Sequence, residues 1–169
     1  MIEVVVARLG LDSSTQSYVV ILQEKDGTRV LPIWIGEPEA QSIVMQMHNI
    51  KRPRPLTHDL VKSLIVGLGG TVKRVQITRV ENNTYYAELH VTHNGQMVQV
   101  DARPSDSIAI ALRVEAPIFA SDELLSELQV EETTEPFGNN LKNAAELSAE
   151  QLKEYLEKLR PEDFGKFNL

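Results

Sequence analysis

The chain has 169 residues and a formal net charge of -7 at pH 7, and 42% of its residues are hydrophobic. This composition excludes a disordered or fibrous protein and predicts one globular domain with an appendage. The chain contains no cysteine, which excludes disulfides, zinc sites built from thiolates and a cysteine nucleophile.

The acidic excess lies in the last part of the chain. Residues 1–120 carry 12 basic and 12 acidic side chains, whereas residues 121–169 carry 5 basic and 12 acidic ones. Exposed charges are screened within about 10 Å at physiological salt. The overall charge therefore does not decide whether the larger, neutral part of the chain binds nucleic acid.

The N-terminal segment does not resemble a signal peptide, because it lacks a basic start and reaches Arg8 early. No apolar run approaches the about 20 residues that a membrane-spanning helix needs. We therefore expect a soluble, cytoplasmic protein with no membrane partner.

Three strands are predicted at the start of the chain, in segments rich in Val, Ile and Leu that cover residues 2–9, 17–24 and 29–35. Asp26-Gly27 between the last two segments is a hairpin signal. The second and third strands are apolar at consecutive positions, which favours strands covered on both faces. Pro32 predicts that the third strand is an edge strand or carries a bulge, because proline has no N–H to donate.

Two helices follow these strands. Pro38 stands at the start of the first helix, whose predicted apolar face consists of Ala40, Ile43, Val44 and Met47. Thr57 is expected to cap the second helix, and Gly69-Gly70 is expected to end it. The predicted apolar face of the second helix consists of Leu60, Val61, Leu64, Ile65 and Leu68.

A similar order recurs in the following residues. Strands are predicted at about 71–80, 84–93 and 96–102, with turns at Asn82-Asn83 and Asn94-Gly95. The middle strand alternates, with these residues pointing inward: Tyr85, Ala87, Leu89 and Val91.

A helix is then predicted to begin at Arg103-Pro104-Ser105-Asp106, and another helix, capped by Ser121, is predicted after Pro117. Matching features of the two halves are 64 to 68 residues apart. Either the chain contains two copies of a three-strand, two-helix unit, or alternating elements match by chance. Both alternatives predict an α+β fold with mixed or antiparallel sheets.

The apolar pattern divides the chain into a domain at residues 1–128, a linker at 129–147 and an acidic tail at 148–169. Ser148 and Gln151 form the pattern of a capping box at the start of a helix in the tail. Its apolar stripe consists of Leu152, Tyr155, Leu156 and Leu159. A helix this short needs a surface to pack on, so we expect it to dock on the domain or on a partner subunit of a homo-oligomer.

Several familiar catalytic motifs are absent from the sequence: a phosphate-binding glycine loop before a helix, a zinc motif with two histidines, and a Gly-x-Ser-x-Gly turn. The histidines are dispersed and are expected at the surface: His48, His58, His90 and His93. His90 and His93 are three residues apart on one strand, so they point to opposite faces and cannot share a metal.

Charged residues gather where helices are predicted to begin: Glu37, Glu39, His58, Asp59, Asp101, Arg103, Ser105 and Asp106. In one interpretation, the acidic residues complement the helix dipoles and Thr57 and Ser105 are caps. In the other, the charges form a site. Arg103 at a helix start requires carboxylates or a bound anion, and Asp106 and Arg113 share one face of an apolar helix. This pattern is typical of a pocket or of an ion-pair network.

Three stretches resemble the bifunctional nuclease domain family: Leu31-Pro32-Ile33-Trp34-Ile35-Gly36-Glu37-Pro38-Glu39-Ala40, Arg54-Pro55-Leu56-Thr57-His58-Asp59-Leu60 and Asp101-Ala102-Arg103-Pro104-Ser105-Asp106-Ser107-Ile108-Ala109. The resemblance covers about residues 1–128. It implies an α+β domain that hydrolyses both RNA and DNA. The sequence matches the motif residues of the family at Glu39, His58, Asp59, Arg103, Ser105 and Asp106.

Phosphodiester cleavage requires an activated nucleophile, neutralisation of the phosphate charge and an acid for the leaving group. We hypothesise that Asp59 and Asp106, with Glu39 or Asp101, hold a divalent cation such as Mg²⁺ or Mn²⁺, and that His58 transfers a proton. Asp59, His58, Asp106 and Glu39 are then the candidate catalytic residues, and the candidates for substrate binding are Arg103, Ser105, Arg54 and Arg113.

Nucleic acid could approach over basic residues that are close in sequence: Lys51, Arg52, Arg54, Lys73, Arg74 and Arg79. The competing hypothesis is a non-enzymatic binding or assembly module, in which the charged residues form a structural network. The catalytic hypothesis requires Asp59, Arg103 and Asp106 to lie within about 10 Å of one another and to be reachable by solvent.

Overall fold

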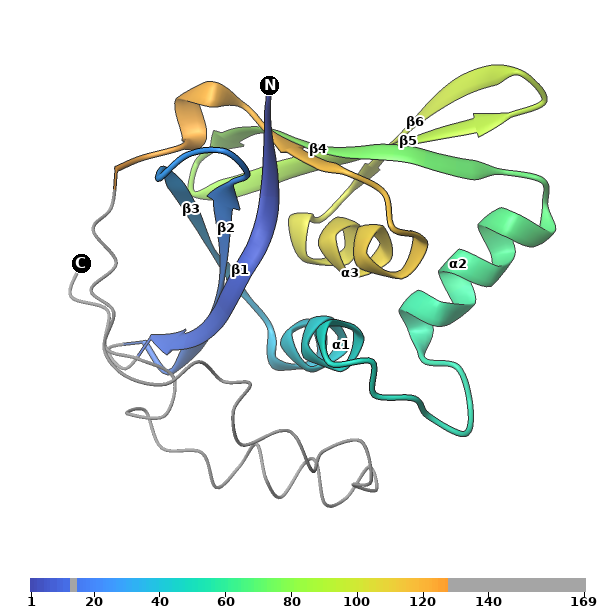
Figure 1. The fold of residues 1–169 in the computed structure, drawn as a ribbon, viewed down its shortest axis with the longest axis horizontal. Helices are drawn as coiled ribbons and strands as arrows, with labels where there is room; N and C mark the ends of the chain where they lie inside the picture. Colours follow the sequence, from blue (N-terminus) through green and yellow to red (C-terminus); the bar gives the residue numbers. More distant parts are fainter. Residues whose placement is uncertain (13–14, 128–169) are drawn as a thin grey trace.

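The computed structural model describes residues 1–12 and 15–127 (Figure 1). The predicted linker at 129–147 and the predicted tail helix at 148–169 lie outside these residues. The elements in chain order are β1 (Ile2–Asp12), β2 (Ser17–Glu24), β3 (Val30–Ile35), α1 (Glu37–Met47), α2 (Thr57–Gly67), β4 (Thr71–Glu81), β5 (Thr84–His93), β6 (Gln96–Ala102), α3 (Pro104–Val114), β7 (Ile118–Ala120) and a 3₁₀ turn (Asp122–Leu124).

The strands form a single mixed sheet in the order β3-β2-β1-β7-β4-β5-β6. Neighbouring strands are antiparallel except β4 and β7, which are parallel. The prediction of an α+β fold is confirmed. Pro32 lies in the edge strand β3, where its missing N–H leaves no gap between paired strands.

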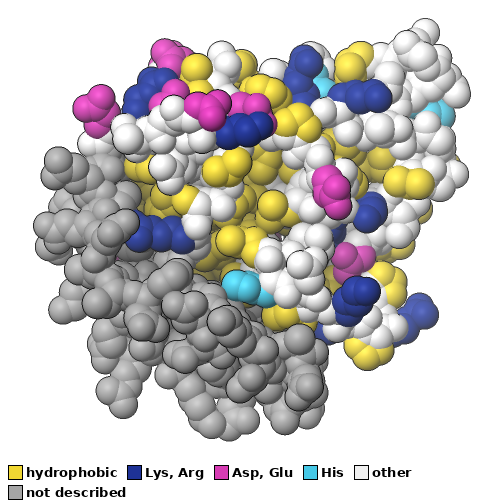
Figure 2. Space-filling view, in the orientation of Figure 1, with side chains coloured by type: hydrophobic (Ala, Val, Ile, Leu, Met, Phe, Trp, Pro, Cys, Tyr) yellow, Lys and Arg dark blue, Asp and Glu magenta, His cyan; other side chains and the backbone are white. Residues whose placement is uncertain are grey.

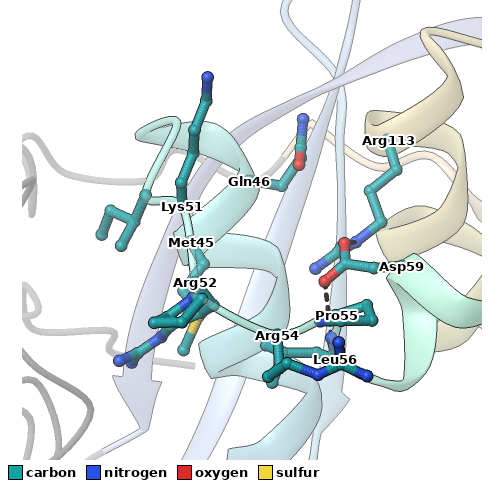
Figure 3. A pocket seen from close by; sticks show the side chains of 11 residues that line it. Met45, Gln46, Lys51, Arg52, Arg54, Pro55, Leu56, Asp59 and Arg113 are labelled. Carbon is teal, nitrogen blue, oxygen red and sulfur yellow. Dashed lines mark hydrogen bonds and ion pairs between the residues drawn. The ribbon is translucent and has the colours of Figure 1, made fainter.

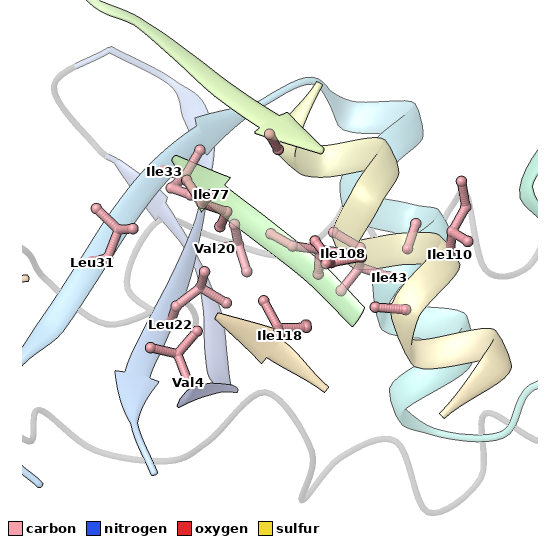
Figure 4. Packing of buried hydrophobic residues seen from close by; sticks show 14 of the residues in the cluster. Val4, Val20, Leu22, Leu31, Ile33, Ile43, Ile77, Ile108, Ile110 and Ile118 are labelled. Atoms are coloured by element: carbon pink, nitrogen blue, oxygen red, sulfur yellow. The ribbon is translucent and has the colours of Figure 1, made fainter. Parts of the chain in front are cut away.

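The main core lies between the sheet and the helices α1 and α3 (Figures 1 and 4). Ile43 of α1 and Ile108 of α3 are fully buried and meet Val20 and Ile77 of the sheet. Each such side chain contributes about 2 kcal/mol through burial. On the other face of β2, Val19 and Ile21 are buried in a smaller cluster with Val30, so β2 is buried on both faces as predicted. The same prediction is wrong for β3, where Trp34 is 39% exposed.

The predicted turns are confirmed. Asn82 and Asn83 join β4 to β5, and Asn94 and Gly95 join β5 to β6. All four residues have positive φ angles of 49 to 76°. Two consecutive positive φ angles match the right-handed twist of a hairpin, and Asn and Gly adopt them at the lowest cost.

The prediction of a helix after Pro117 is wrong. Residues Ile118–Ala120 form β7, and only a short 3₁₀ turn follows Ser121. β7 occupies the gap between β1 and β4, where both neighbours offer backbone groups to a strand. The strand is flanked by hydrogen bonds from Val75 N–H to the Pro117 carbonyl, at 3.0 Å, and from Ser121 N–H to the Ile77 carbonyl, at 2.9 Å. Up to residue 127, where the described part of the chain ends, the second half has no counterpart of α2, and a duplication is not shown.

The predicted apolar face of α2 is only partly buried. Val61 and Ile65 pack against the core, whereas Leu60, Leu64 and Leu68 are more than half exposed. The helix ends near Gly69, whose φ of +79° turns the chain out of the helix, as predicted. None of the helices in the described ranges is long and apolar enough to cross a membrane.

The prediction that all histidines lie at the surface is wrong for His90, which is 2% exposed. β5 lies between β4 and β6, so Arg74 and Gln99 flank His90 on the neighbouring strands. Long side chains on both neighbours can bury a residue even on the face of the sheet opposite the main core. His93 is exposed near the end of the strand.

Candidate functional site

Most candidate residues come from the N-terminal parts of three helices, except Arg113 in the last turn of α3, Asp101 of β6 and Arg54 of the loop between α1 and α2. α3 packs against both α1 and α2, which brings these helix starts together (Figure 1). Thr57 and Ser105 do not cap their helices, because the N-cap positions are Leu56 and Arg103. The capping interpretation is therefore wrong for these two residues, and the acidic side chains have other partners.

His58 of α2 connects α1 to α3. Its Nδ1 lies 2.8 Å from the hydroxyl oxygen of Ser42 in α1, and its Nε2 lies 3.0 Å from Oδ1 of Asp106 in α3. An ionised carboxylate only accepts hydrogen bonds, so Nε2 is the donor to Asp106. Nδ1 of a neutral His58 then accepts the proton of Ser42, and Asp106 fixes the tautomer of the imidazole.

Arg103 joins Asp106 to Glu39. Its Nε and Nη2 donate to the two oxygens of Asp106 at 2.7 and 3.0 Å, and Nη2 also donates to Oε1 of Glu39 at 2.7 Å. Carboxylates therefore neutralise the cation at this helix start. Burial alone would raise the pKa of Asp106, but hydrogen bonds from Arg103 and His58 outweigh burial and hold the pKa below its usual value.

Arg113 forms the inner part of the same network (Figure 3). Its guanidinium donates to Oδ1 of Asp59 at 2.6 Å and to the carbonyls of Ala109 and Ser42 at 2.9 and 3.3 Å. Asp59 also accepts the N–H of Leu56 at 2.8 Å, which satisfies the first turn of α2. Burial raises the pKa of Asp59, but the bonds from Arg113 and Leu56 outweigh it, so the net pKa is lowered.

Ser42 links the two parts of the network and is absent from the predicted site. It is 4% exposed, and it binds His58 through its hydroxyl and Arg113 through its carbonyl. The available signal was a polar residue directly beside Ile43 and Val44 on a buried helix face. Because Ser42 is buried, it orients His58 and does not meet a substrate itself.

The network reaches solvent at Arg103 and Asp106, whose side chains are 65% and 27% exposed. Arg103 and Asp106 are in direct contact, and Asp59 is connected to them through its neighbour His58. Arg103 and Asp106 therefore meet where solvent reaches them, and Asp59, whose side chain is 37% exposed, is the residue next to His58.

Three candidate residues stand apart from the network. Asp101 is exposed near the end of β6, Arg54 is exposed in the loop between α1 and α2, and Ser105 is buried in the first turn of α3. Within residues 1–12 and 15–127, no side-chain hydrogen bond or ion pair joins these three residues to the network.

No group of three His, Asp or Glu side chains in the described part of the chain is arranged to hold a metal ion. Asp59 and Asp106 are each bound to an arginine. A cation here would have to take part of its ligands from water or substrate.

The predicted basic residues lie in two places. Lys51, Arg52 and Arg54 belong to the loop between α1 and α2, whereas Lys73, Arg74 and Arg79 lie on β4. Figure 1 shows this loop and β4 on opposite sides of α3. The basic residues therefore do not form one continuous track.

The chain belongs to the bifunctional nuclease domain family, whose sequence model matches residues 20–133. The uncharacterized protein Rv1829 of Mycobacterium tuberculosis is 38% identical over 162 residues, which cover 96% of this chain and 97% of that protein. Bifunctional nuclease 1 of Oryza sativa subsp. indica is 32% identical over 114 residues, or 65% of this chain. Bifunctional nuclease 2 of Arabidopsis thaliana is 34% identical over 103 residues, or 59% of this chain.

The two plant nucleases are longer proteins. The matched regions cover 34% of the rice protein and 31% of the Arabidopsis protein. The matched part of this chain therefore corresponds to about a third of each plant nuclease, whereas the mycobacterial relative matches along almost its whole length.

Proposed function

We propose that this chain is a nuclease that hydrolyses phosphodiester bonds of RNA and DNA at the network of His58, Asp106 and Arg103. The observation that carries the proposal is the contact of an oriented imidazole with an accessible carboxylate that also binds an exposed arginine. Membership of the bifunctional nuclease domain family and the names of the plant relatives support the same activity.

The network contains the groups that hydrolysis needs. The side chain of Arg103 is 65% exposed, so its guanidinium can donate to a substrate phosphate in addition to its bonds to Asp106 and Glu39. Asp106 accepts the proton of the attacking water, whose oxygen forms the new bond to phosphorus. His58 donates its Nε2 proton to the leaving oxygen as the old P–O bond breaks, and the proton on Asp106 then passes to Nε2.

The remaining residues position these groups. Glu39 holds Arg103 from α1, and Ser42 orients the imidazole of His58. Arg113 and Asp59 fasten the start of α2 to α3, so that His58 stays beside Asp106. Asp59 and Glu39 are therefore proposed to position other groups, with a less direct role than Asp106.

A divalent cation remains part of the proposal. Asp106 presents an accessible carboxylate next to the position where phosphate would bind. Mg²⁺ commonly binds through one or two carboxylates together with substrate phosphates and water, so it does not require a closed set of protein ligands. The lack of cysteine is compatible with a reducing compartment and supports the proposed cytoplasmic location.

The test uses the purified full chain with end-labelled single-stranded RNA, single-stranded DNA and duplex DNA. Cleavage is followed on gels with EDTA, Mg²⁺ or Mn²⁺. Asp106→Asn and His58→Gln should each lower the cleavage rate at least about 100-fold, because each removes a group that transfers the proton. Melting curves verify that both variants are folded. Asp106→Asn should melt somewhat below the wild type at pH 7, because the lowered pKa of Asp106 means that its ionised form stabilises the fold.

The matched controls are Asp26→Asn, in the exposed turn between β2 and β3, and His93→Gln, near the end of β5. Both should cleave like the wild type. Unchanged rates in Asp106→Asn and His58→Gln would disprove the site. A wild-type chain that cleaves none of the substrates with any cation would disprove the nuclease itself.

The second candidate is a binding or assembly module that forms a homo-oligomer. The observation in its favour is the apolar surface on α2 and β6: Leu60, Leu64, Val66, Leu68, Met97, Val98 and Val100. Figure 2 shows hydrophobic side chains among basic ones where α2 lies. Salt separates the candidates, because nucleic-acid affinity that depends on phosphate contacts falls steeply with salt. An apolar interface between subunits does not weaken in this way.

A further inference from the structure

A cavity of about 350 Å³ opens beside the network, between α1, α3 and the loop that joins α1 to α2 (Figure 3). Asp59 and Arg113 lie on one side with Leu56 next to Asp59, and Lys51 and Arg52 of the loop lie on the other. Ile50 and Arg54 of the same loop also line the cavity. Its volume is within the range of small-molecule sites, about 300–1,000 Å³.

The cavity is strongly positive. Four cationic side chains line it, Lys51, Arg52, Arg54 and Arg113, against the single carboxylate of Asp59. Asp59 is paired with Arg113, so the other three cations set the charge that a ligand meets. In the described ranges, Lys51, Arg52 and Arg54 form no ion pair with a carboxylate. A group with one or two negative charges is the ligand that this surface attracts most.

The rest of the lining is apolar or amide. Met45, Ile50 and Leu56 supply hydrophobic surface next to the basic loop, as do two prolines of that loop. Gln46 donates its amide N–H to the Leu112 carbonyl at 3.4 Å. Its amide oxygen remains as an acceptor in the lining. A flat, partly polar ring fits such a surface better than a bare inorganic anion does.

The cavity adjoins the proposed catalytic residues. Asp59 lines the cavity, and the next residue toward the N-terminus, His58, binds Asp106. Arg113 belongs to the cavity lining and to the network. In the network it binds the carboxylate of Asp59 and the carbonyl of Ser42. A ligand in the cavity would therefore lie next to the helix start that carries His58.

We propose that this cavity binds one nucleotide unit, with its phosphate at Arg52 and Arg54 and its base against Ile50 and Leu56. This proposal rests on the proposed nuclease function, for which the cavity would hold a nucleotide adjacent to the cleaved bond. A free nucleotide and a unit of a strand share this chemistry, so the experiment must separate them.

Binding to the full chain is measured by titration calorimetry in EDTA with four probes: AMP, adenosine, inorganic phosphate and the dinucleotide ApA. AMP should bind, and adenosine and phosphate should each bind at least about tenfold more weakly, because each lacks half of the contacts. Arg54→Gln and Arg52→Gln should each weaken AMP binding about tenfold, equivalent to the loss of one charge-assisted contact.

Lys25→Gln is the matched control, because Lys25 is a surface cation in the turn between β2 and β3, far along the chain from the cavity loop. It should bind AMP like the wild type. Both test residues belong to a surface loop, and a melting curve for each variant verifies that the fold is kept. Competition identifies the source: ApA that displaces AMP indicates a strand unit, and AMP that ApA does not displace indicates a free nucleotide.

Undetectable AMP binding, or equal AMP binding by the wild type and both arginine variants, would overturn the proposal. The measurement requires no cleavage, so its outcome is separate from that of the nuclease assay. Nucleotide binding without cleavage would support the proposed nucleotide site and disprove the proposed nuclease function. Cleavage without nucleotide binding would support the nuclease function and disprove the nucleotide site.

Discussion

Arg113 is the most deeply buried charge of the network, at 6% exposure, and its three partners lie on three helices: Ser42 on α1, Asp59 on α2 and Ala109 on its own helix α3. Its replacement by alanine removes the guanidinium from the carboxylate of Asp59, which keeps only the N–H of Leu56, and from the carbonyls of Ala109 and Ser42. Arg113→Ala should therefore lower the free energy of unfolding by about 3 kcal/mol. Urea denaturation measures this change.

Lys25→Ala is the control for Arg113→Ala, because Lys25 forms an exposed ion pair with Glu3 at 2.7 Å. An exposed pair contributes little to stability, so this variant should unfold near the wild-type midpoint. Equal effects of the two substitutions would show that the buried network does not hold the helices together.

Asp59 links the network to acid stability. Its pKa is lowered in the folded chain, so the ionised form contributes stability at neutral pH. This contribution is complete above the unfolded pKa of about 4 and is lost as the pH falls through the lower folded value. Asp59→Asn should therefore lower the melting temperature at pH 7 and reduce its fall between about pH 5 and pH 2.5. Thermal melts across this pH range measure the melting temperatures of the wild type and of Asp59→Asn. Parallel curves of melting temperature against pH would contradict a stabilising role for ionised Asp59.

The site was predictable residue by residue only in part. The prediction that Arg103 at a helix start needs carboxylates is confirmed by its bonds to Asp106 and Glu39. Ser42 was missed because a small polar residue on a buried helix face gives no signal of its partner. Arg113 was placed correctly on the helix face of Asp106, but its bond to Asp59 depends on how α2 packs.

At the scale of elements, the edge strand β6 has unpaired backbone groups that could bind another strand. It is an edge strand with no proline and no lysine, and Met97, Val98 and Val100 are exposed. Such an edge is open to pairing with another strand. If two copies pair in antiparallel register about Gln99, Asp101 lies opposite Met97, so no like charges face each other. The edge is therefore complementary to itself.

The combined variant Val98→Lys, Val100→Lys should convert the proposed homo-oligomer to a monomer, because it brings four cations to the symmetric interface. Light scattering after size-exclusion chromatography measures the mass, and circular dichroism verifies the fold. Val80→Lys, at an exposed valine near the end of β4, is the matched control and should keep the oligomer. A wild-type chain that is monomeric at about 50 μM would refute self-association.

The sequence predicted most elements because their signals are local. The hairpin turns and the start of α3 agree with the structure to within a few residues. The short strand β7 was missed, because three residues carry too little periodicity to signal a strand, and the helix predicted to begin at Ser121 is only a 3₁₀ turn. Its strand conformation comes from the open positions of β1 and β4 on either side.

At the scale of the whole molecule, charge is distributed by region. The 12 basic and 12 acidic residues before residue 121 balance, yet the structure separates them locally. Carboxylates surround Arg103, whereas the cavity beside Arg113 is lined by four cations and one carboxylate. A neutral total therefore conceals a basic cavity and an acidic network side by side.

The sequence by itself determined the family, the α+β class, the turns and the presence of charges at helix starts, because these depend on residues close together in the chain. Only the tertiary structure decided which charges meet. Arg103 binds Glu39 across 64 positions, and His58 binds Asp106 across 48. These contacts exist because α3 packs against both α1 and α2, and that packing is determined by apolar surfaces from the whole domain.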